Sequence, residues 1–146
     1  MFTKTNRKLM LKHYSYVRVR YADTDQMKYA YNGKYFEYFE VGRTEMMREV
    51  GLPYKVIEDN GYFMPVIETK ITFHSPAFYD ELLEVETRVE QVPTSKVHID
   101  HIVKAKERDV VVATGYVELA FLNAKTYKPT RAPKFFIDAV KKYYEV

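Results

Sequence analysis

The chain has 146 residues, with six Pro, five Gly, no Cys and a formal net charge of +3. This length predicts one domain that can bury its own core, and the missing thiols exclude disulfides, thiolate catalysis and cysteine-bound metal. Residues 1–13 hold four basic and no acidic residues, so we expect a basic N-terminal tail followed by a nearly neutral domain over residues 14–146. That distribution argues against a nucleic-acid partner, which would require basic residues on a folded face.

A strand and then a long helix are predicted for the first third of the chain. Residues 14–21 alternate in polarity, as expected for a strand. Residues 33–50 carry apolar residues at helical spacing, so one face of this helix must be buried. The stripe consists of Tyr35, Phe39, Gly42, Met46 and Val50, widened by Phe36 and Met47. Asn32 is a suitable N-cap, and Gly51 can take the left-handed conformation that ends a helix.

Four more strands and a final helix are predicted for the rest of the chain. The strands cover residues 63–74, 82–92, 95–107 and 110–123. Pro65 indicates that the first of these begins beyond that point or has an exposed edge there. Arg108 and Asp109 predict a tight hairpin between the last two strands. Residues 133–144 predict a helix, so the chain has the pattern of an α+β domain.

A polar turn between the first strand and the long helix holds two carboxylates, Asp23 and Asp25. The start of a helix carries partial positive charge and free N–H donors, which suit a carbonyl oxygen that becomes an oxyanion. A carboxylate within loop reach of that helix start could attack the carbonyl carbon, while the N–H groups of the helix stabilise the oxyanion. By spacing alone, a solvated turn residue is the more common role for an aspartate at this position.

Other kinds of catalytic site find little support in the sequence. There is no H-E-x-x-H motif or comparable cluster of metal ligands, no G-x-S-x-G nucleophile turn and no glycine-rich phosphate loop. We therefore expect no metal and no cofactor. The first 13 residues lack the apolar core of a signal peptide, and no segment is long and apolar enough to span a bilayer, so we expect a cytoplasmic protein without membrane contact.

Several motifs together resemble those of one enzyme family. The turn reads Y-A-D-T-D-Q-M over residues 21–27, and Tyr31-Asn32, Tyr35, Phe39-Glu40 and Gly42 to Glu45 follow on the predicted helix. Residues 61–66 read G-Y-F-M-P-V, residues 75–77 S-P-A and residues 80–82 D-E-L. These motifs resemble the 4-hydroxybenzoyl-CoA thioesterase and YbgC-like acyl-CoA thioesterases, and the similarity covers most of residues 16–123.

The resemblance implies a fold, a substrate and an assembly. The hotdog fold of that family has one long central helix wrapped by a curved, mainly antiparallel sheet of about five strands, here with a short C-terminal helix. Its members hydrolyse acyl-CoA thioesters without a cofactor. They form homodimers with a continuous sheet, often stacked into homotetramers, and their sites lie between protomers.

The resemblance also implies roles for particular residues. Asp25 corresponds to the catalytic aspartate, which acts as nucleophile or as the base for a water. Asn32 corresponds to the residue whose backbone N–H polarises the thioester. Substrate-binding walls are expected from Tyr29, Tyr31 and Tyr35.

The sequence departs from the family pattern inside the turn, and two alternatives stay open. The family usually has Gly at the position of Lys28, small β-branched residues at Tyr29 and Ala30, and in many members His at Asn32. Losing a glycine narrows the conformations that the turn can adopt.

Glu40 is an alternative catalytic carboxylate, because a second class of hotdog thioesterases places its carboxylate on the helix. The other alternative is a non-catalytic module that binds an acyl or aromatic ligand.

Overall fold

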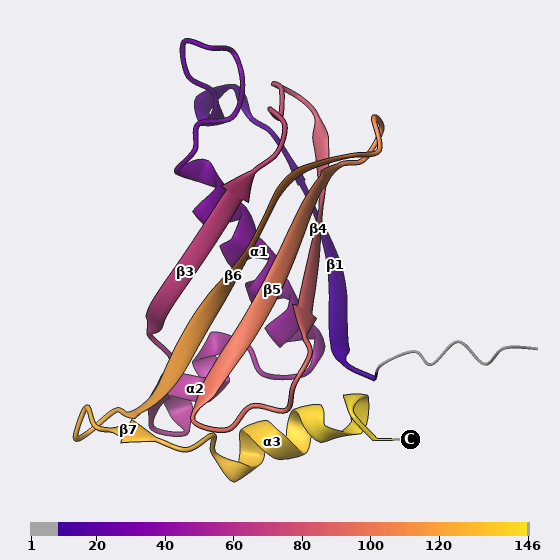
Figure 1. The fold of residues 1–146 in the computed structure, drawn as a ribbon. Helices are drawn as coiled ribbons and strands as arrows, with labels where there is room; N and C mark the ends of the chain where they lie inside the picture. Colours follow the sequence, from indigo (N-terminus) through magenta and orange to yellow (C-terminus); the bar gives the residue numbers. More distant parts are fainter. Residues whose placement is uncertain (1–8, 146) are drawn as a thin grey trace, which may run out of the picture.

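The computed structural model describes residues 9–145 as an antiparallel sheet packed against one long helix (Figure 1). The strands are β1 (Leu11–Arg18), β2 (Tyr62–Phe63), β3 (Val66–Phe73), β4 (Leu82–Val89), β5 (Lys96–Ala105), β6 (Val110–Asn123) and β7 (Pro129–Thr130). The helices are α1 (Lys34–Glu49), α2 (Tyr54–Asp59) and α3 (Lys134–Val140), with short 3-10 turns at Tyr21–Asp23 and Lys141–Tyr143. The long strands run in the order β1-β4-β5-β6-β3, and β2 and β7 pair with the far end of β6.

The α+β prediction is confirmed, with a central helix and a short C-terminal helix, but the strand boundaries need correction. The sheet has seven strands rather than about five, because the predicted strand 63–74 divides around Pro65 and the exit from β6 adds β7. Pro65 does precede an exposed edge strand, as predicted. The first strand spans Leu11–Arg18 instead of 14–21. Of the predicted tail, residues 1–8 lie outside the described residues.

The start of α1 lies one residue later than predicted. Its N-cap position is Gly33, and no side chain caps the helix, so the prediction of Asn32 as N-cap is wrong. The physical reason is a turn that precedes the helix: the N–H groups of Lys34 and Tyr35 donate to the carbonyl oxygens of Tyr31 and Asn32. At the other end Gly51 has φ +81° and donates to the carbonyl of Arg48, which confirms its predicted role.

Helix α1 packs across β1, β4 and β5. Its buried face is the predicted stripe, shifted toward Tyr38 and away from Phe36. Its buried residues are Tyr35, Tyr38, Phe39, Gly42 and Met46. Phe36 was expected in the stripe but is 48% exposed, because it faces the rim of the sheet at β3. Gly42 allows the closest approach: a Cβ there would lie 2.5 Å from Oγ1 of Thr87 on β4.

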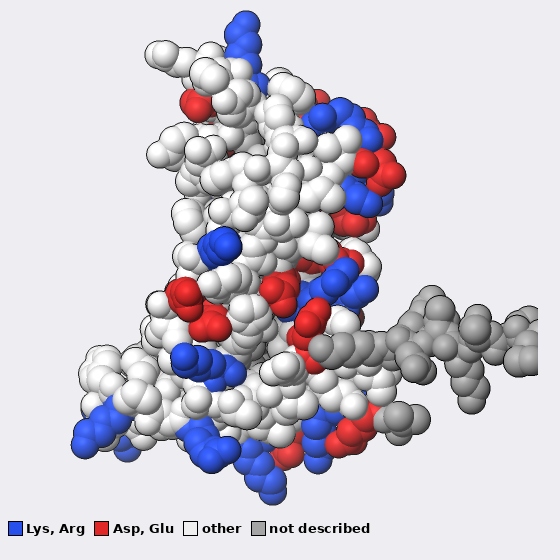
Figure 2. Space-filling model, in the orientation of Figure 1, with Lys and Arg blue, Asp and Glu red and all other residues white. Residues whose placement is uncertain are grey.

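The alternation of the central strands sets which side chains form the core. β4 buries Leu83, Val85, Thr87 and Val89, and β5 buries Val97, Ile99, His101, Val103 and Ala105, as their period of two predicts. The opposite face of the sheet is polar. Figure 2 shows acidic and basic side chains lying beside one another along the right edge and in the lower part of the molecule. Lys104 and Asp109 form one of the ion pairs of the sheet.

β3 is the least buried of the long strands. Within the described residues it pairs with β6 alone, so its other edge is open. Seven of its eight residues are exposed, among them Val66, Ile67 and Phe73. The predicted inward side of this strand, with Ile67 and Phe73, is therefore only partly correct. An open edge with exposed apolar side chains is a surface that proteins normally cover.

Candidate active site

The chain between β1 and α1 forms a small hairpin that carries the predicted catalytic turn. Thr24 and Ala30 form an antiparallel bridge, and Tyr29 forms a second bridge with Phe78. The N–H of Lys28 donates to the carbonyl oxygen of Asp25 at 2.9 Å and closes the turn. Lys28 has φ +67°, the left-handed conformation that a glycine adopts easily. The turn therefore forms even though Lys28 stands where the family usually has glycine.

Asp23 is the buried carboxylate of this segment, with 2% of its surface exposed. Its Oδ2 accepts from the backbone N–H of Arg20 at 3.0 Å and from the hydroxyl of Tyr38 at 3.1 Å, and its Oδ1 accepts from Arg20 Nη2. Burial would raise the pKa of this carboxyl group, but the hydrogen bonds from Arg20 and Tyr38 outweigh burial and lower it. Asp23 therefore stays ionised and ties the turn to α1.

Asp25 lies at the tip of the hairpin and is exposed in the single chain. Its Oδ1 accepts from the N–H of Met27 at 2.8 Å, and its own N–H donates to the carbonyl oxygen of Tyr29. Within the described residues its Oδ2 has no hydrogen-bond partner. One carboxylate oxygen is thus fixed by the turn, and the other is available to a water or a substrate.

The start of α1 presents free backbone donors. In the part of the chain that the structure describes, the N–H groups of Asn32 and Gly33 make no hydrogen bond. A cavity of about 310 Å³ lies against Asn32, between this turn and the end of β3. It is lined by Tyr29, Ala30, Asn32, Tyr35, Phe73, His74, Ser75 and Pro76. An oxygen atom placed there would meet both the positive end of the helix and unpaired N–H groups.

The structure brings three of the six predicted site residues together at this cavity: Tyr29, Asn32 and Tyr35. Tyr35 is buried and makes edge-on contacts with Tyr38 and Phe73, so it is a packing residue as well as a wall. Burial raises the pKa of its hydroxyl, which stays protonated. Tyr31 is 57% exposed and lies against Gly33, outside the cavity lining. Asp25 lies outside that lining too.

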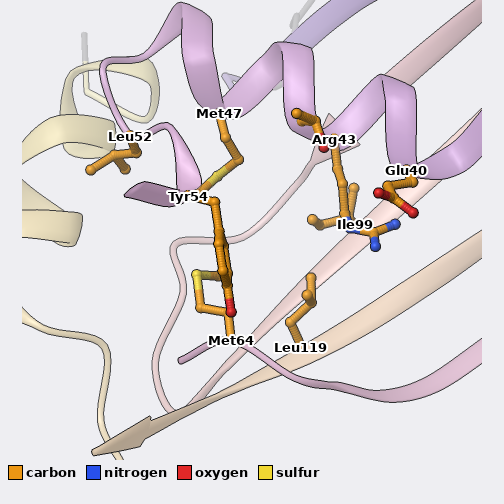
Figure 3. A pocket seen from close by; sticks show the side chains of 9 residues that line it. Glu40, Arg43, Met47, Leu52, Tyr54, Met64, Ile99 and Leu119 are labelled. Carbon is orange, nitrogen blue, oxygen red and sulfur yellow. The ribbon is translucent and has the colours of Figure 1, made fainter. Parts of the chain in front are cut away.

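Glu40, the alternative carboxylate, lies further along α1 on two other cavities. It shares both with Arg43. The larger, of about 450 Å³, lies beneath the second half of α1, and Figure 3 shows the two charged groups close together at one end of it. Glu40 is exposed. It follows Gly33 by seven residues, so it lies about two helical turns from the free N–H groups at the start of α1.

Neither a metal site nor a membrane-spanning helix is found in the described residues. Among residues 9–145, no group of three or more His, Asp or Glu side chains could hold a metal ion. No helix in this part of the chain combines the length and the apolar character needed to cross a bilayer.

Comparison with known proteins places the chain in a family. The sequence model of the Thioesterase-like superfamily matches residues 19–140. The chain belongs to this superfamily. YneP of Bacillus subtilis is 32% identical over 124 residues, which are 84% of this chain and 88% of YneP. The acyl-CoA thioester hydrolase YbgC of Escherichia coli is 27% identical over 126 residues, or 86% of this chain and 92% of YbgC.

A solved thioesterase has the same fold. The DHNA-CoA thioesterase of Staphylococcus aureus superimposes with a TM-score of 0.82 and 28% sequence identity, covering 91% of this chain and 88% of that one. The matched span of the superfamily begins just before the hairpin of Asp25 and ends within α3. The predicted family and the hotdog-like fold are therefore confirmed.

Three important residues escaped the sequence prediction. Tyr38 was not singled out, although its spacing from Tyr35 placed it beside the predicted stripe. His74 follows β3 and reaches the cavity only because β3 runs alongside α1. Arg43 was considered only as a salt-bridge partner of Glu40, and no such ion pair is present in the described residues. Neither His74 nor Arg43 carried a local signal, because their positions depend on how the sheet and helix pack.

Proposed function

We propose that this protein hydrolyses acyl-CoA thioesters at the start of α1. The observation that carries the proposal is the pair of unpaired N–H groups at Asn32 and Gly33, because Asn32 lines a cavity beside the hairpin of Asp25. Membership of the superfamily and the similarity to YbgC, an acyl-CoA thioester hydrolase, support the acyl-CoA substrate. The thioester carbonyl oxygen would lie against these donors, where developing negative charge is most stabilised.

In the proposed reaction, Asp25 acts through its free oxygen. It attacks the carbonyl carbon directly, or it takes a proton from a water that attacks. The carbon–sulfur bond then breaks, and the thiolate leaves and takes up a proton as coenzyme A. After direct attack the acyl group stays on Asp25 as a mixed anhydride, which a water hydrolyses to the free carboxylate with return of Asp25. After attack by a water the carboxylic acid is released in the same step. Lys34 and Arg20 pair with Asp23, so Asp23 is committed to holding the turn and is not the proposed reactive group.

We further propose that the working form is a homodimer joined along β3, or a homotetramer of two such dimers. The open edge of β3 and its exposed apolar residues support this form. Phe73 lies both on β3 and on the cavity, so a second copy on this edge would cover the site and shield Asp25 from bulk water. The cytoplasmic location and the absence of a cofactor remain predictions, whereas the tail is shorter than residues 1–13 because β1 begins at Leu11.

The alternative is a non-catalytic module that binds an acyl or aromatic ligand. The observation that favours it is the size of Tyr29, which lines the cavity where the family has a small side chain. A bulky wall would hold an aromatic group well and leave less room for the attacking water. Binding without release of thiol would identify this function.

A thiol-release screen separates the two functions. Purified protein is mixed with short-chain, long-chain and aromatic acyl-CoAs, and free thiol is followed by a chromogenic disulfide. The proposal predicts catalytic turnover of at least one class. Saturable binding of these compounds with no thiol release would support the binding module instead. A Glu40→Gln variant that loses activity would move the catalytic role to the helix.

A further inference from the structure

A second cavity, remote from the start of α1, is formed by the second half of that helix. It measures about 450 Å³ and lies between α1, the start of α2 and strands β5 and β6. Its floor is apolar and is made by Met47, Leu52, Met64, Ile99 and Leu119. Figure 3 shows Met47, Leu52, Tyr54 and Met64 at one end of it and Glu40 and Arg43 at the other. This volume is in the range of sites for small organic molecules, about 300–1,000 Å³.

The guanidinium of Arg43 is the unusual group in this wall. It is partly buried, and in residues 9–145 it makes no hydrogen bond and no ion pair. Burial lowers the pKa of Arg43, and the charge of Glu40 partly offsets that effect. An arginine keeps its charge even so, because its pKa starts so high. Arg43 thus lines the cavity, and its N–H donors have no acceptor from the described chain.

We propose that this cavity binds an apolar monocarboxylate. The carboxylate would pair with the guanidinium of Arg43, whose planar fork matches two carboxylate oxygens. The hydrocarbon part would lie on the apolar floor, where two methionines can adapt to chains of different shape. An alcohol or an amine of the same size lacks the charge that Arg43 requires. A highly charged molecule would not fit the apolar floor.

The site is distinct from the proposed catalytic one. Arg43 is nine residues beyond Lys34, which is about 14 Å along a helix that rises 1.5 Å per residue. A carboxylic acid is also the product of thioester hydrolysis, so the expected source of the ligand rests on the proposed function, whereas the binding does not. The geometry thus points to a second binding site, away from the helix start, where the released acid or a related acid can bind.

Glu40 should affect carboxylate binding in the direction opposite to Arg43. Its carboxylate lies on both cavities with Arg43 and repels an incoming anion, which weakens the attraction of Arg43 for the ligand. Replacing Glu40 by Gln removes that repulsion and keeps the side-chain size. The change should therefore tighten binding of a carboxylate, while loss of Arg43 weakens it. A cavity that selects only by hydrophobicity would respond to neither change.

Isothermal titration calorimetry at pH 7.5 tests the site on the full chain, with decanoate as the probe. Decylammonium and propionate are the comparison probes, since the first reverses the charge and the second lacks the hydrocarbon. We expect saturable binding of decanoate and at least tenfold weaker binding of either comparison probe. Equal binding of decanoate and decylammonium, or no saturable binding of decanoate, would overturn the proposal.

Variants assign the binding to this cavity. Arg43→Met should weaken decanoate binding by about tenfold or more, the scale of a hydrogen-bonded charge, and Glu40→Gln should tighten it. Lys55→Met removes an exposed charge on neighbouring α2 and should change nothing. Met47→Trp fills the cavity without altering either charge, so it should abolish binding even if the Arg43 variant folds poorly.

Thiol release is measured in parallel. Unchanged decanoate affinity in Arg43→Met and Met47→Trp contradicts this site alone, whereas missing thiol release contradicts the proposed hydrolysis alone.

Discussion

The hydroxyl of Tyr38 donates to Oδ2 of Asp23 at 3.1 Å and so joins the second turn of α1 to the segment that follows β1. Both residues are buried. The carbonyl oxygen of Asp23 also accepts from the N–H of Tyr31 at 2.8 Å, just before the free N–H groups of Asn32 and Gly33. Asp23 thereby holds both ends of the hairpin that carries Asp25.

Tyr38→Phe should lower the free energy of unfolding by about 1–3 kcal/mol at pH 7, because it removes a donor from a buried carboxylate. The effect depends on pH. The folded pKa of Asp23 is lowered, so its contribution is present above the unfolded pKa and is lost as the pH falls through the folded value. Urea unfolding at pH 7 and at pH 3 measures the difference. A deficit that is equally large at both pH values would contradict the role given to this hydrogen bond.

His101 predicts a second pH dependence. Burial, and next the nearby charge of Arg43, lower the pKa of His101 from 6.5 to about 3, and its Nε2 is buried without a partner in the described residues. The folded state keeps this ring neutral, so unfolding takes up a proton between those values. The contribution is complete above pH 6.5 and is lost as the pH falls toward 3.

His101→Gln should therefore flatten the dependence of the unfolding free energy on pH between about 4 and 6, by up to about 1.4 kcal/mol per pH unit. Gln can still bond to Thr87, the partner of His101 Nδ1 at 3.1 Å. Unfolding curves at half-unit pH steps provide the measurement. The role of burial would be wrong if wild type and variant followed parallel curves over this range.

Gly42→Ala should destabilise the fold by about 1–3 kcal/mol, the scale of overpacking a core. The new methyl group would lie 2.5 Å from Oγ1 of Thr87 and 2.8 Å from Cγ1 of Val85, so α1 must move away from β4. Thr44→Ala, an exposed change on the same helix, is the control and should stay within about 0.5 kcal/mol. Thermal unfolding of both variants tests the prediction, which fails if they behave alike.

Ile67→Glu should convert the proposed dimer into a monomer, because it places a charge among the exposed apolar residues of β3. Val92→Glu introduces the same charge at an exposed apolar residue between β4 and β5 and should leave the assembly unchanged. Sedimentation velocity gives the masses. If Ile67→Glu sediments as wild type does, β3 is not the interface. If wild type is itself monomeric, the proposed assembly is wrong.

The elements that the sequence predicted best are those with local signals. The period of two in β4 and β5 placed nine inward residues correctly, because each strand is central and has one buried face. Gly51 ended α1 as predicted, since a left-handed residue is required there. The family motifs around Asp25 predicted the fold, but they are features of a family and not consequences of local geometry.

The errors arise where long-range packing decides. Phe36 fits the helical stripe, yet it is exposed because the sheet ends at β3 beside it. Asn32 has the chemistry of an N-cap, but the turn at Tyr31 moves the helix start to Gly33. Asp25 is exposed because it lies at the tip of the hairpin. None of these outcomes is encoded in the spacing of nearby residues.

The catalytic role of Asp25 is tested most directly by steady-state thiol release with the best acyl-CoA of the screen. Asp25→Asn should keep the fold and the assembly while losing at least about 10²-fold in kcat/KM, as expected when a base or nucleophile is removed. Asp80 is also an exposed turn aspartate, so Asp80→Asn is the matched control and should retain wild-type rates. A variant Asp25→Asn that hydrolyses the substrate as fast as the Asp80→Asn control would contradict the account.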